Sequence, residues 1–248
     1  MLKTPLNSDC YDQSTWYKSM PVFQLDESIS FPPPQMARED GLLAVGGDLS
    51  PERILLAYHL GIFPWYGPDE PILWWSPDPR LVLFPDDFHL SKSLAKTIKQ
   101  QEFTTTFDTS FAEVIRNCAE SRQQKGEGTW IDEQMIEAYC KLHEMGYAHS
   151  VESWQEGELK GGLYGLSLGS VFFGESMFSL SPNSSKVAMA ALVERLVNWE
   201  FDMIDCQVGT SHLKSLGAED ISGAEFWERL ALSVDKPTII GNWGEDKL

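Results

Sequence analysis

Residues 161–207 read GGLYGLSLGSVFFGESMFSLSPNSSKVAMAALVERLVNWEFDMIDCQ, and this stretch decides the fold of the chain. Its first part contains two runs of apolar and aromatic residues, at 161–168 and 170–178, which meet at Gly169. Glycine between two such runs favours a tight hairpin turn. We therefore predict two antiparallel strands here.

A helix and a third strand are predicted to follow the hairpin. A turn is indicated at 181–185, and either Ser184 or Ser185 can cap the helix that follows. Apolar residues then recur at helical spacing, at Val187, Ala188, Ala191, Leu192 and Leu196. Because residues 201–208 have the pattern of a strand, the whole unit reads strand, strand, helix, strand.

Three polar side chains stand out in this apolar unit. Glu175 follows two phenylalanines and a glycine, and Asp205 and Gln207 are two residues apart in the last predicted strand. Residues i and i+2 of a strand face the same side, so Asp205 and Gln207 should project together, opposite Ile204 and Cys206. A buried carboxylate is costly unless it has a partner or a task. The three side chains are either satisfied structural groups or, as their grouping favours, a functional site.

The composition is that of a folded, acidic protein. The chain has 248 residues, 42% of them hydrophobic, and a formal net charge of −18. This charge argues against broad non-specific binding of nucleic acid, which needs many phosphate contacts. The sequence has no apolar run long enough to span a membrane and no export signal, so we expect a cytoplasmic protein.

The four cysteines do not indicate a metal or redox motif. Cys10, Cys118, Cys140 and Cys206 lie far apart and form no CxxC pair. The last three lie in apolar-periodic runs and should be buried thiols. A nucleophilic Cys206 is the less favoured interpretation because no adjacent base is visible.

Charge is distributed unevenly along the chain. Residues 1–85 carry 5 basic and 11 acidic side chains, residues 86–125 carry 6 and 6, and residues 126–248 carry 8 and 20. A polyanion should therefore prefer the middle segment, and a cationic substrate the C-terminal part. The clearest basic stripe is one face of a predicted helix in the middle segment, formed by Lys92, Lys96 and Lys99.

Two domains are predicted, a small irregular lobe at 1–80 and a larger domain at 81–248. Eleven of the 14 prolines lie between residues 21 and 85, together with many aromatic residues, so this part should pack on the larger domain. The larger domain has the element order of an α+β fold, a mostly antiparallel sheet flanked by helices with one βαβ crossover. This is similar to the GCN5-related acyltransferase architecture. Residues 181–186 lack the glycines of that class's pyrophosphate loop, so the acyl donor need not be acyl-CoA.

Eight runs in register carry a more specific resemblance. They are GLLAVGGDLSPERILLAYHLGIFPWY at 41–66, ILWWSPDPR at 72–80, EGTWI at 127–131, AYCKLHEMGYAHSVE at 138–152, GGLYG at 161–165, FFGESMFS at 172–179, NSSK at 183–186 and IDCQV at 204–208. Together they resemble the leucyl/phenylalanyl-tRNA–protein transferase family over roughly residues 31–218. The resemblance implies an enzyme that moves Leu or Phe, with Met as a third candidate, from aminoacyl-tRNA to proteins with N-terminal Arg or Lys, marking them for N-degron proteolysis.

By this resemblance the catalytic residues are Asp205, Gln207 and Glu175. The reaction is aminolysis of an ester, and an α-amino group with a pKa of roughly 7.7–8.0 is partly neutral near pH 7. A modest general base and good positioning can therefore suffice. We expect Asp205 to act as base or to orient the amine. Gln207 is expected to hydrogen-bond the amine or the carbonyl, and Glu175 to hold the cationic acceptor end.

The resemblance also implies where the donor binds. The pocket for the donor side chain matches Leu163, Phe172, Met189 and Ile204, although core packing would explain each of these equally well. The terminal adenosine is expected near Trp65 and Trp130, where base stacking supports the same role. Our own choice for the tRNA phosphates is the lysine stripe described above.

Three other functions are compatible with the residues alone. An acyl-CoA N-acyltransferase would bind CoA and would not need tRNA. A non-catalytic module would bind tRNA, or peptides with N-terminal Arg or Lys, without turnover. A transferase acting on a cell-wall peptide would share the aminoacyl-tRNA donor and differ in its acceptor. For the enzyme we expect a monomer without cofactor or metal.

Overall fold

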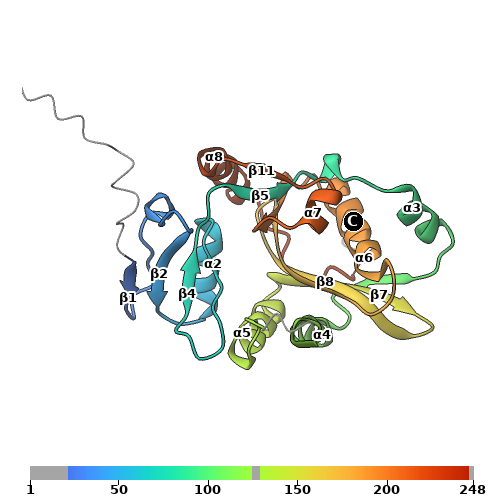
Figure 1. Cartoon of the computed structure of the whole chain (residues 1–248), viewed down its shortest axis with the longest axis horizontal. Coiled ribbons are helices and arrows are strands. Elements are labelled where there is room, and N and C mark those ends of the chain that lie inside the picture. The colour runs from blue at the N-terminus through green and yellow to red at the C-terminus, as the bar shows by residue number, and fades with distance from the viewer. Residues whose placement is uncertain (1–21, 125–128, 246–248) are drawn as a thin grey trace, which may run out of the picture.

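A computed structural model describes residues 22–124 and 129–245, which form two neighbouring sheets (Figure 1). The N-terminal sheet has the strand order β1-β2-β4-β3. Its elements are β1 (Phe23–Leu25), η1 (Pro34–Met36), β2 (Leu42–Gly46), α2 (Pro51–His59), β3 (Phe63–Pro64) and β4 (Leu73–Trp75). Residues 1–21, 125–128 and 246–248 lie outside the described residues.

The larger sheet has the strand order β11-β5-β10-β9-β8-β7-β6. Its strands are β5 (Arg80–Leu83), β6 (Thr104–Phe107), β7 (Ala148–Gln155), β8 (Glu158–Leu168), β9 (Val171–Ser179), β10 (Met203–Gln207) and β11 (Glu219–Ile221). The helices around it are η2 (Pro85–Asp87), α3 (Lys92–Lys99), α4 (Phe111–Gln124), α5 (Glu133–Glu144), α6 (Ser184–Asn198), α7 (Ser211–Ser215) and α8 (Gly223–Val234).

The predicted strand, strand, helix, strand unit is confirmed as β8, β9, α6 and β10. Strands β8 and β9 pair antiparallel, and their turn passes through Gly169 with a φ of +56°. Strands β9 and β10 pair parallel across the α6 crossover, whereas the other pairings in this sheet are antiparallel. The predicted α+β class, with a mostly antiparallel sheet flanked by helices, is therefore confirmed.

The predicted serine cap of α6 is wrong. The residue at the cap is Asn183, which has a left-handed backbone (φ +68°), and Ser184 already lies in the first helical turn. The Ser184 hydroxyl is used instead to join the helix to the sheet, because it donates to the carbonyl oxygen of Lys160 at 2.7 Å. This close approach requires Gly161, since a Cβ there would lie 2.4 Å from the Ser184 hydroxyl oxygen.

The two faces of the larger sheet bury different clusters. Helices α4 and α5 cover one face, and α6 covers the other (Figure 1). We call these the α5 face and the α6 face. Ile204 and Cys206, which were predicted to share one side of their strand, both pack on the α6 face, together with Leu163, Phe172 and Met189.

Strands β9 and β10 separate partway along their length, and this opens the sheet. Their pairing runs from Val171 and Met203 to Phe173 and Asp205 and ends there. Beyond this point β9 continues beside β8 alone, and Glu175 is the extra residue of a bulge between the Gly174 and Ser176 pairings. A bulge redirects its side chain, so Glu175 can point into the opening.

The C-terminal segment docks across the α6 face through Trp243. Its ring stacks on His149 with centroids 3.8 Å apart, and its backbone N–H donates to Asp108 at 2.6 Å.

The chain passes from the N-terminal sheet to the larger sheet between Trp75 and Arg80, close to the domain division expected at residue 80. The domain limits themselves stay a prediction. Within the described residues, no helix has both the length and the hydropathy that crossing a membrane would require.

Candidate active site

A cavity of about 540 Å³ lies where β9 and β10 separate. Its walls come from both faces of the sheet, so it passes through the opening between the two strands. The cavity is lined by residues of the N-terminal sheet, of strands β8, β9 and β10, and of helices α4, α6 and α7. Among them are Trp65, Arg122, Trp130, Leu163, Phe172, Glu175, Met189, Ile204, Cys206 and Gln207.

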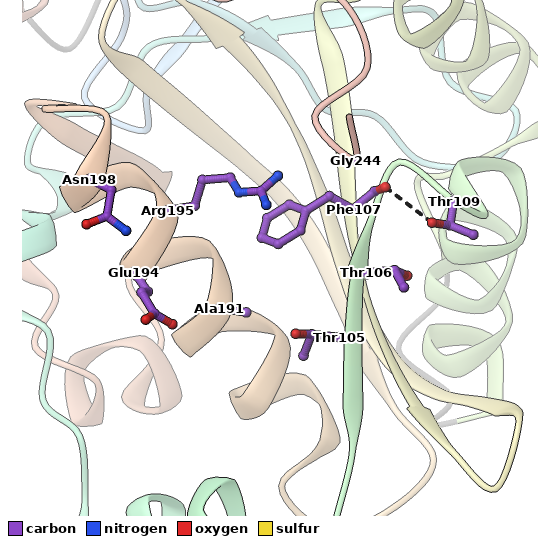
Figure 2. Close-up of a pocket in the computed structure, with 9 residues that line it drawn as sticks. All are labelled: Thr105, Thr106, Phe107, Thr109, Ala191, Glu194, Arg195, Asn198 and Gly244. Carbon is purple, nitrogen blue, oxygen red and sulfur yellow. Dashed lines mark hydrogen bonds between the residues drawn. The ribbon is translucent and has the colours of Figure 1, made fainter. Parts of the chain in front are cut away.

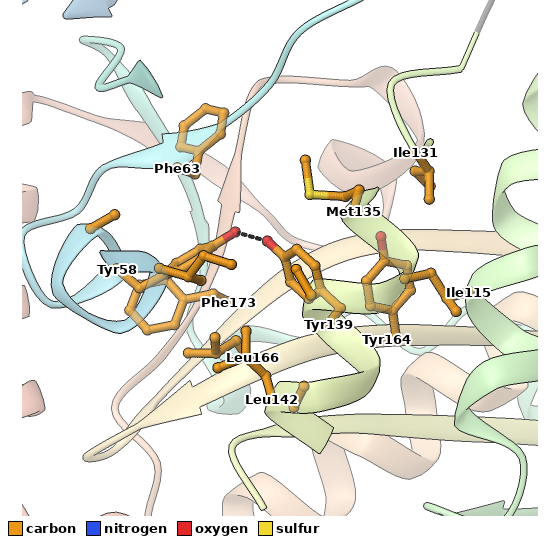
Figure 3. Packing of buried hydrophobic residues seen from close by; sticks show 14 of the residues in the cluster. Tyr58, Phe63, Ile115, Ile131, Met135, Tyr139, Leu142, Tyr164, Leu166 and Phe173 are labelled. Atoms are coloured by element: carbon orange, nitrogen blue, oxygen red, sulfur yellow. Dashed lines mark hydrogen bonds between the residues drawn. The ribbon is translucent and has the colours of Figure 1, made fainter. Parts of the chain in front are cut away.

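Glu175 is held at this opening by a chain of hydrogen bonds. Tyr58 donates to its Oε1 at 2.5 Å, and the Gln207 amide nitrogen donates to the same oxygen at 3.1 Å. The hydroxyls of Tyr58 and Tyr139 lie 2.5 Å apart (Figure 3). Because a hydroxyl has a single proton, Tyr139 donates to Tyr58, which donates to Glu175. The carboxylate is therefore fixed from two helices and a neighbouring strand.

The surroundings of Glu175 make it a weaker acid than usual. Burial, the largest cause, raises the pKa of Glu175 to about 7. The hydrogen bonds from Tyr58 and Gln207 oppose this rise, and the charge of Asp205 adds to it. Burial also raises the pKa of the Tyr58 and Tyr139 hydroxyls well above the usual range, so both stay protonated as donors. A carboxylate with a pKa near 7 can both accept and return a proton at neutral pH.

Asp205 lies close to Glu175, but it is paired with an arginine and does not line the cavity. It is fully buried, and both of its oxygens accept hydrogen bonds from Arg80, at 2.8 and 2.6 Å. Oδ1 also accepts the backbone N–H of Gln207 at 2.9 Å. The Arg80 guanidinium lies over the rings of Phe63 and Phe226, at 4.8 and 4.5 Å. Asp205 is thus a paired carboxylate behind the cavity wall, and it fixes the backbone of Gln207.

The part of the cavity on the α6 face is apolar. Leu163, Phe172, Met189 and Ile204, the four residues that the sequence assigns to the donor pocket, all line it and all are buried. Cys206 lines the same chamber, and burial raises the pKa of its thiol. A protonated, buried thiol is a poor nucleophile, which argues against the nucleophilic interpretation of Cys206.

The opposite end of the cavity is aromatic and carries one fixed positive charge. Trp65 is 42% exposed there and its ring lies 5.6 Å from that of Trp75. Trp130 and Arg122 line the same end, with the guanidinium carbon 5.9 Å from the centre of the Trp130 ring. The two tryptophans of the sequence prediction are therefore brought to one cavity with the catalytic candidates.

The lysine stripe is not brought to this cavity. Lys92, Lys96 and Lys99 are exposed on α3, and none of them lines the cavity. Helix α3 packs on α6 at the end of the molecule away from the N-terminal sheet (Figure 1). If these lysines contact a tRNA, the contact involves a part of the tRNA that is outside the cavity.

A second cavity, of about 440 Å³, lies between β6 and α6 (Figure 2). Thr105, Phe107, Glu194 and Arg195 are among its walls. The Arg195 guanidinium lies 3.6 Å from the centre of the Phe107 ring and also donates to the carbonyl of Trp243. None of the side chains that the sequence assigns to the site lines this cavity.

Sequence reasoning missed four residues of the site, Arg80, Tyr58, Tyr139 and Arg122. Tyr58 and Tyr139 occupy apolar positions of their helices, where a tyrosine has the pattern of a core residue. Arg80 ends the run ILWWSPDPR, and this run was the one signal that could have drawn attention to it. Residues 22–124 and 129–245 contain no group of three or more His, Cys, Asp or Glu side chains that could hold a metal ion.

Comparisons with known proteins match this chain to a family. The family described as leucyl/phenylalanyl-tRNA protein transferase matches residues 82–231, and its N-terminal domain matches residues 47–78. A protein of that name from Desulfatibacillum aliphaticivorans is 58% identical over 224 residues, covering 90% of this chain and 96% of the relative. One from Stutzerimonas stutzeri is 54% identical over 226 residues, covering 90% and 96%.

Among solved structures, an aminoglycoside acetyltransferase from an uncultured soil metagenomic sample aligns with a TM-score of 0.37 at 10% identity. The alignment covers 57% of this chain and 94% of the acetyltransferase.

Proposed function

This chain belongs to the leucyl/phenylalanyl-tRNA protein transferase family, and we propose that it transfers Leu or Phe from aminoacyl-tRNA to proteins with N-terminal Arg or Lys. Aminoacyl transfer to a protein is the activity that the family name describes. The acceptor preference, a role in N-degron proteolysis, action as a monomer and a place in the cytoplasm are further parts of the proposal. The acidic C-terminal part of the chain, with 20 acidic and 8 basic side chains, supports a cationic acceptor.

One cavity is lined by all the residues assigned to the donor side chain and the terminal adenosine, and this observation carries the proposal. Its apolar chamber suits the side chain of Leu or Phe, and its aromatic end suits a stacked adenosine. The ester that joins the amino acid to the ribose would then lie between them, beside Glu175 and Gln207. An acyl-CoA enzyme or a non-catalytic module would not require this sequence of apolar, polar and aromatic parts.

The two carboxylates suit different tasks in the transfer. The neutral acceptor amine attacks the ester carbonyl and becomes an ammonium in the tetrahedral intermediate. Its proton moves to a base, the C–O bond to the ribose breaks, and the base returns the proton to the departing ribose oxygen. Glu175 lines the cavity and has its pKa raised to about 7, which supports a direct contact with the acceptor ammonium and its proton. Asp205 is already bound to Arg80, which supports the orienting role over that of a general base. It would act through Gln207, whose amide can bind the reacting carbonyl.

The direct test is transfer of radiolabelled leucine from Leu-tRNA to a peptide that begins with Arg. Matched acceptors are the same peptide with an acetylated N-terminus and a peptide that begins with Gly. Acetyl-CoA serves as the alternative donor, and Gln207→Ala as the impaired enzyme. We expect transfer only from the tRNA and only to the free N-terminal Arg. Acetylation from acetyl-CoA, or equal transfer to the Gly peptide, would contradict the donor or the acceptor part of the proposal.

The donor preference should respond to the volume of the apolar chamber. Met189→Phe adds a rigid ring to a wall that Met189 and Phe172 share. Discrimination by an apolar pocket is worth about 1–3 kcal/mol, so we expect kcat/KM for Phe-tRNA to fall about tenfold or more relative to Leu-tRNA. Met145→Phe is the control, because Met145 is 40% exposed and lies outside the cavity. A parallel fall for both donors would mean that Met189 does not contact the donor side chain.

A further inference from the structure

An aminoacyl-tRNA brings a negative charge to the same ribose that carries the amino acid. The ester is on the 3′ side of the terminal adenosine, and a phosphodiester is on its 5′ side. If the adenosine stacks at Trp65 and Trp130, this phosphate must lie at the aromatic end of the cavity. The inference about which residue binds this phosphate rests on the proposed function. The exposed lysines of α3 do not line the cavity, so they are not placed to bind it.

Arg122 is the residue of the described cavity wall that can meet this charge. Of the side chains described as lining the cavity, it alone carries a permanent positive charge. It lies in the last turn of α4, is partly buried, and donates through Nε to the Ser176 hydroxyl at 3.3 Å. Its guanidinium carbon is 5.9 Å from the centre of the Trp130 ring. These contacts hold the planar group between the aromatic end and the residue next to Glu175.

Arg122 differs from most arginines of the described residues, because no carboxylate is found beside it there. Arg38, Arg53, Arg80, Arg116 and Arg229 each form an ion pair with a carboxylate. Across residues 22–124 and 129–245, no such pair is found for Arg122, although the chain has 37 acidic residues against 19 basic ones. Because Arg122 also lines the cavity, a guanidinium that no carboxylate of the described residues neutralises is suited to an anion supplied by the substrate.

We propose that Arg122 binds the phosphodiester on the 5′ side of the donor's terminal adenosine. A guanidinium presents five N–H donors in a planar fork, of which Nε is used by Ser176, so its terminal nitrogens can form paired hydrogen bonds to phosphate oxygens. The phosphate contact fixes the ribose at the mouth of the cavity and directs the ester toward Glu175 and Gln207. Arg122 is thus a substrate-binding residue, separate from the lysine stripe.

The test compares two small donors that differ only in the phosphate. One is 3′-O-phenylalanyl adenosine, which has none. The other is the same ester on cytidylyl-(3′→5′)-adenosine, which has the phosphodiester in question. Transfer to the Arg peptide is measured for the intact protein, for Arg122→Gln, for Arg122→Lys and for Arg116→Gln. Arg116 is the matched control because it lies on the same helix and pairs with Glu133 outside the cavity.

Arg122→Gln should lower kcat/KM for the dinucleotide donor by about 10- to 100-fold, as expected for loss of a charge-assisted hydrogen bond. The same substitution should change kcat/KM for the adenosine donor by less than about twofold. For the dinucleotide donor, kcat/KM of Arg122→Lys should lie between the values of the intact protein and Arg122→Gln. Lysine keeps the positive charge but loses the planar fork of N–H donors. The salt dependence for the dinucleotide should also weaken, with the logarithmic slope falling by about 0.7 for one lost phosphate contact. The Arg116→Gln protein should match the intact protein.

An equal loss with both donors would overturn the proposal, since Arg122 would then serve the ester or the fold rather than the phosphate. The absence of any loss with either donor would overturn it as well. Both outcomes leave transfer by the intact protein in place, so they do not affect the proposed function. If the intact protein uses neither donor nor full Leu-tRNA, the proposed function fails, and the role of Arg122 falls with it.

Discussion

Replacing Glu175 by Gln is expected to lower kcat/KM for aminoacyl transfer by about 10²–10⁴-fold, the usual contribution of a positioned general base. The amide keeps the shape of the side chain and can still accept from Tyr58, so the fold should be unchanged. It cannot accept the proton of the acceptor ammonium. Steady-state transfer from Leu-tRNA to the Arg peptide measures the loss, and thermal unfolding of the variant checks its fold.

The pH profile distinguishes a proton acceptor from a group that only holds the substrate. Burial raises the pKa of Glu175 to about 7, so below that pH the free protein holds Glu175 neutral and unable to accept a proton. The rate should therefore rise with pH through about 7. The acceptor amine adds a second rise at roughly 7.7–8.0, because only its neutral form attacks. In Glu175→Gln the first rise should disappear and only that of the amine should remain.

The matched control for this experiment is Glu158→Gln. Its side chain is 70% exposed beside Lys160, outside the cavity, so it should leave both the rate and the pH profile unchanged. If Glu175→Gln lowers the rate but keeps both rises, Glu175 binds the acceptor without taking its proton. The base would then have to be another group, and the arrangement of the two carboxylates proposed above would be wrong.

The sequence predicted the parts of this site that local patterns specify. The hairpin at Gly169 and the α6 crossover follow from apolar periodicity and a turn residue, and Asp205 and Gln207 stood out because a polar residue in a buried strand is costly. Ser184 is the exception. Its position favoured a helix cap, but the close packing of α6 on β8 uses its hydroxyl for the carbonyl of Lys160 instead.

The partners of the three predicted residues could not be found in this way, because each contact joins distant parts of the chain. Arg80 and Asp205 are 125 residues apart, and Tyr58 and Glu175 are 117 apart. A tyrosine hydroxyl leaves no trace in apolar periodicity, and an arginine after a proline-rich run gives no sign of burial. These contacts depend on tertiary structure, and they decide that Glu175, rather than Asp205, is the carboxylate with access to the cavity.

Replacing Arg80 by Met is expected to destabilise the fold by about 3–5 kcal/mol, because it leaves the fully buried Asp205 without its counter-charge. For a domain of this size the midpoint of thermal unfolding should fall by roughly 6–20 °C. Arg38→Met is the control. Arg38 and Asp40 form an ion pair with side chains 44% and 49% exposed, and such pairs contribute at most about 1 kcal/mol.

A double variant separates the stability of the pair from its role in the site. Arg80→Met with Asp205→Leu replaces two buried charges by apolar groups, so most of the lost stability should return. Activity should not return, because Asp205 also accepts the backbone N–H of Gln207 and thereby positions the amide that contacts Glu175. A stable double variant with full activity would exclude this positioning role. A double variant no more stable than Arg80→Met would mean that the guanidinium contributes mainly through its packing on Phe63 and Phe226, and that the charge of Asp205 is of minor importance.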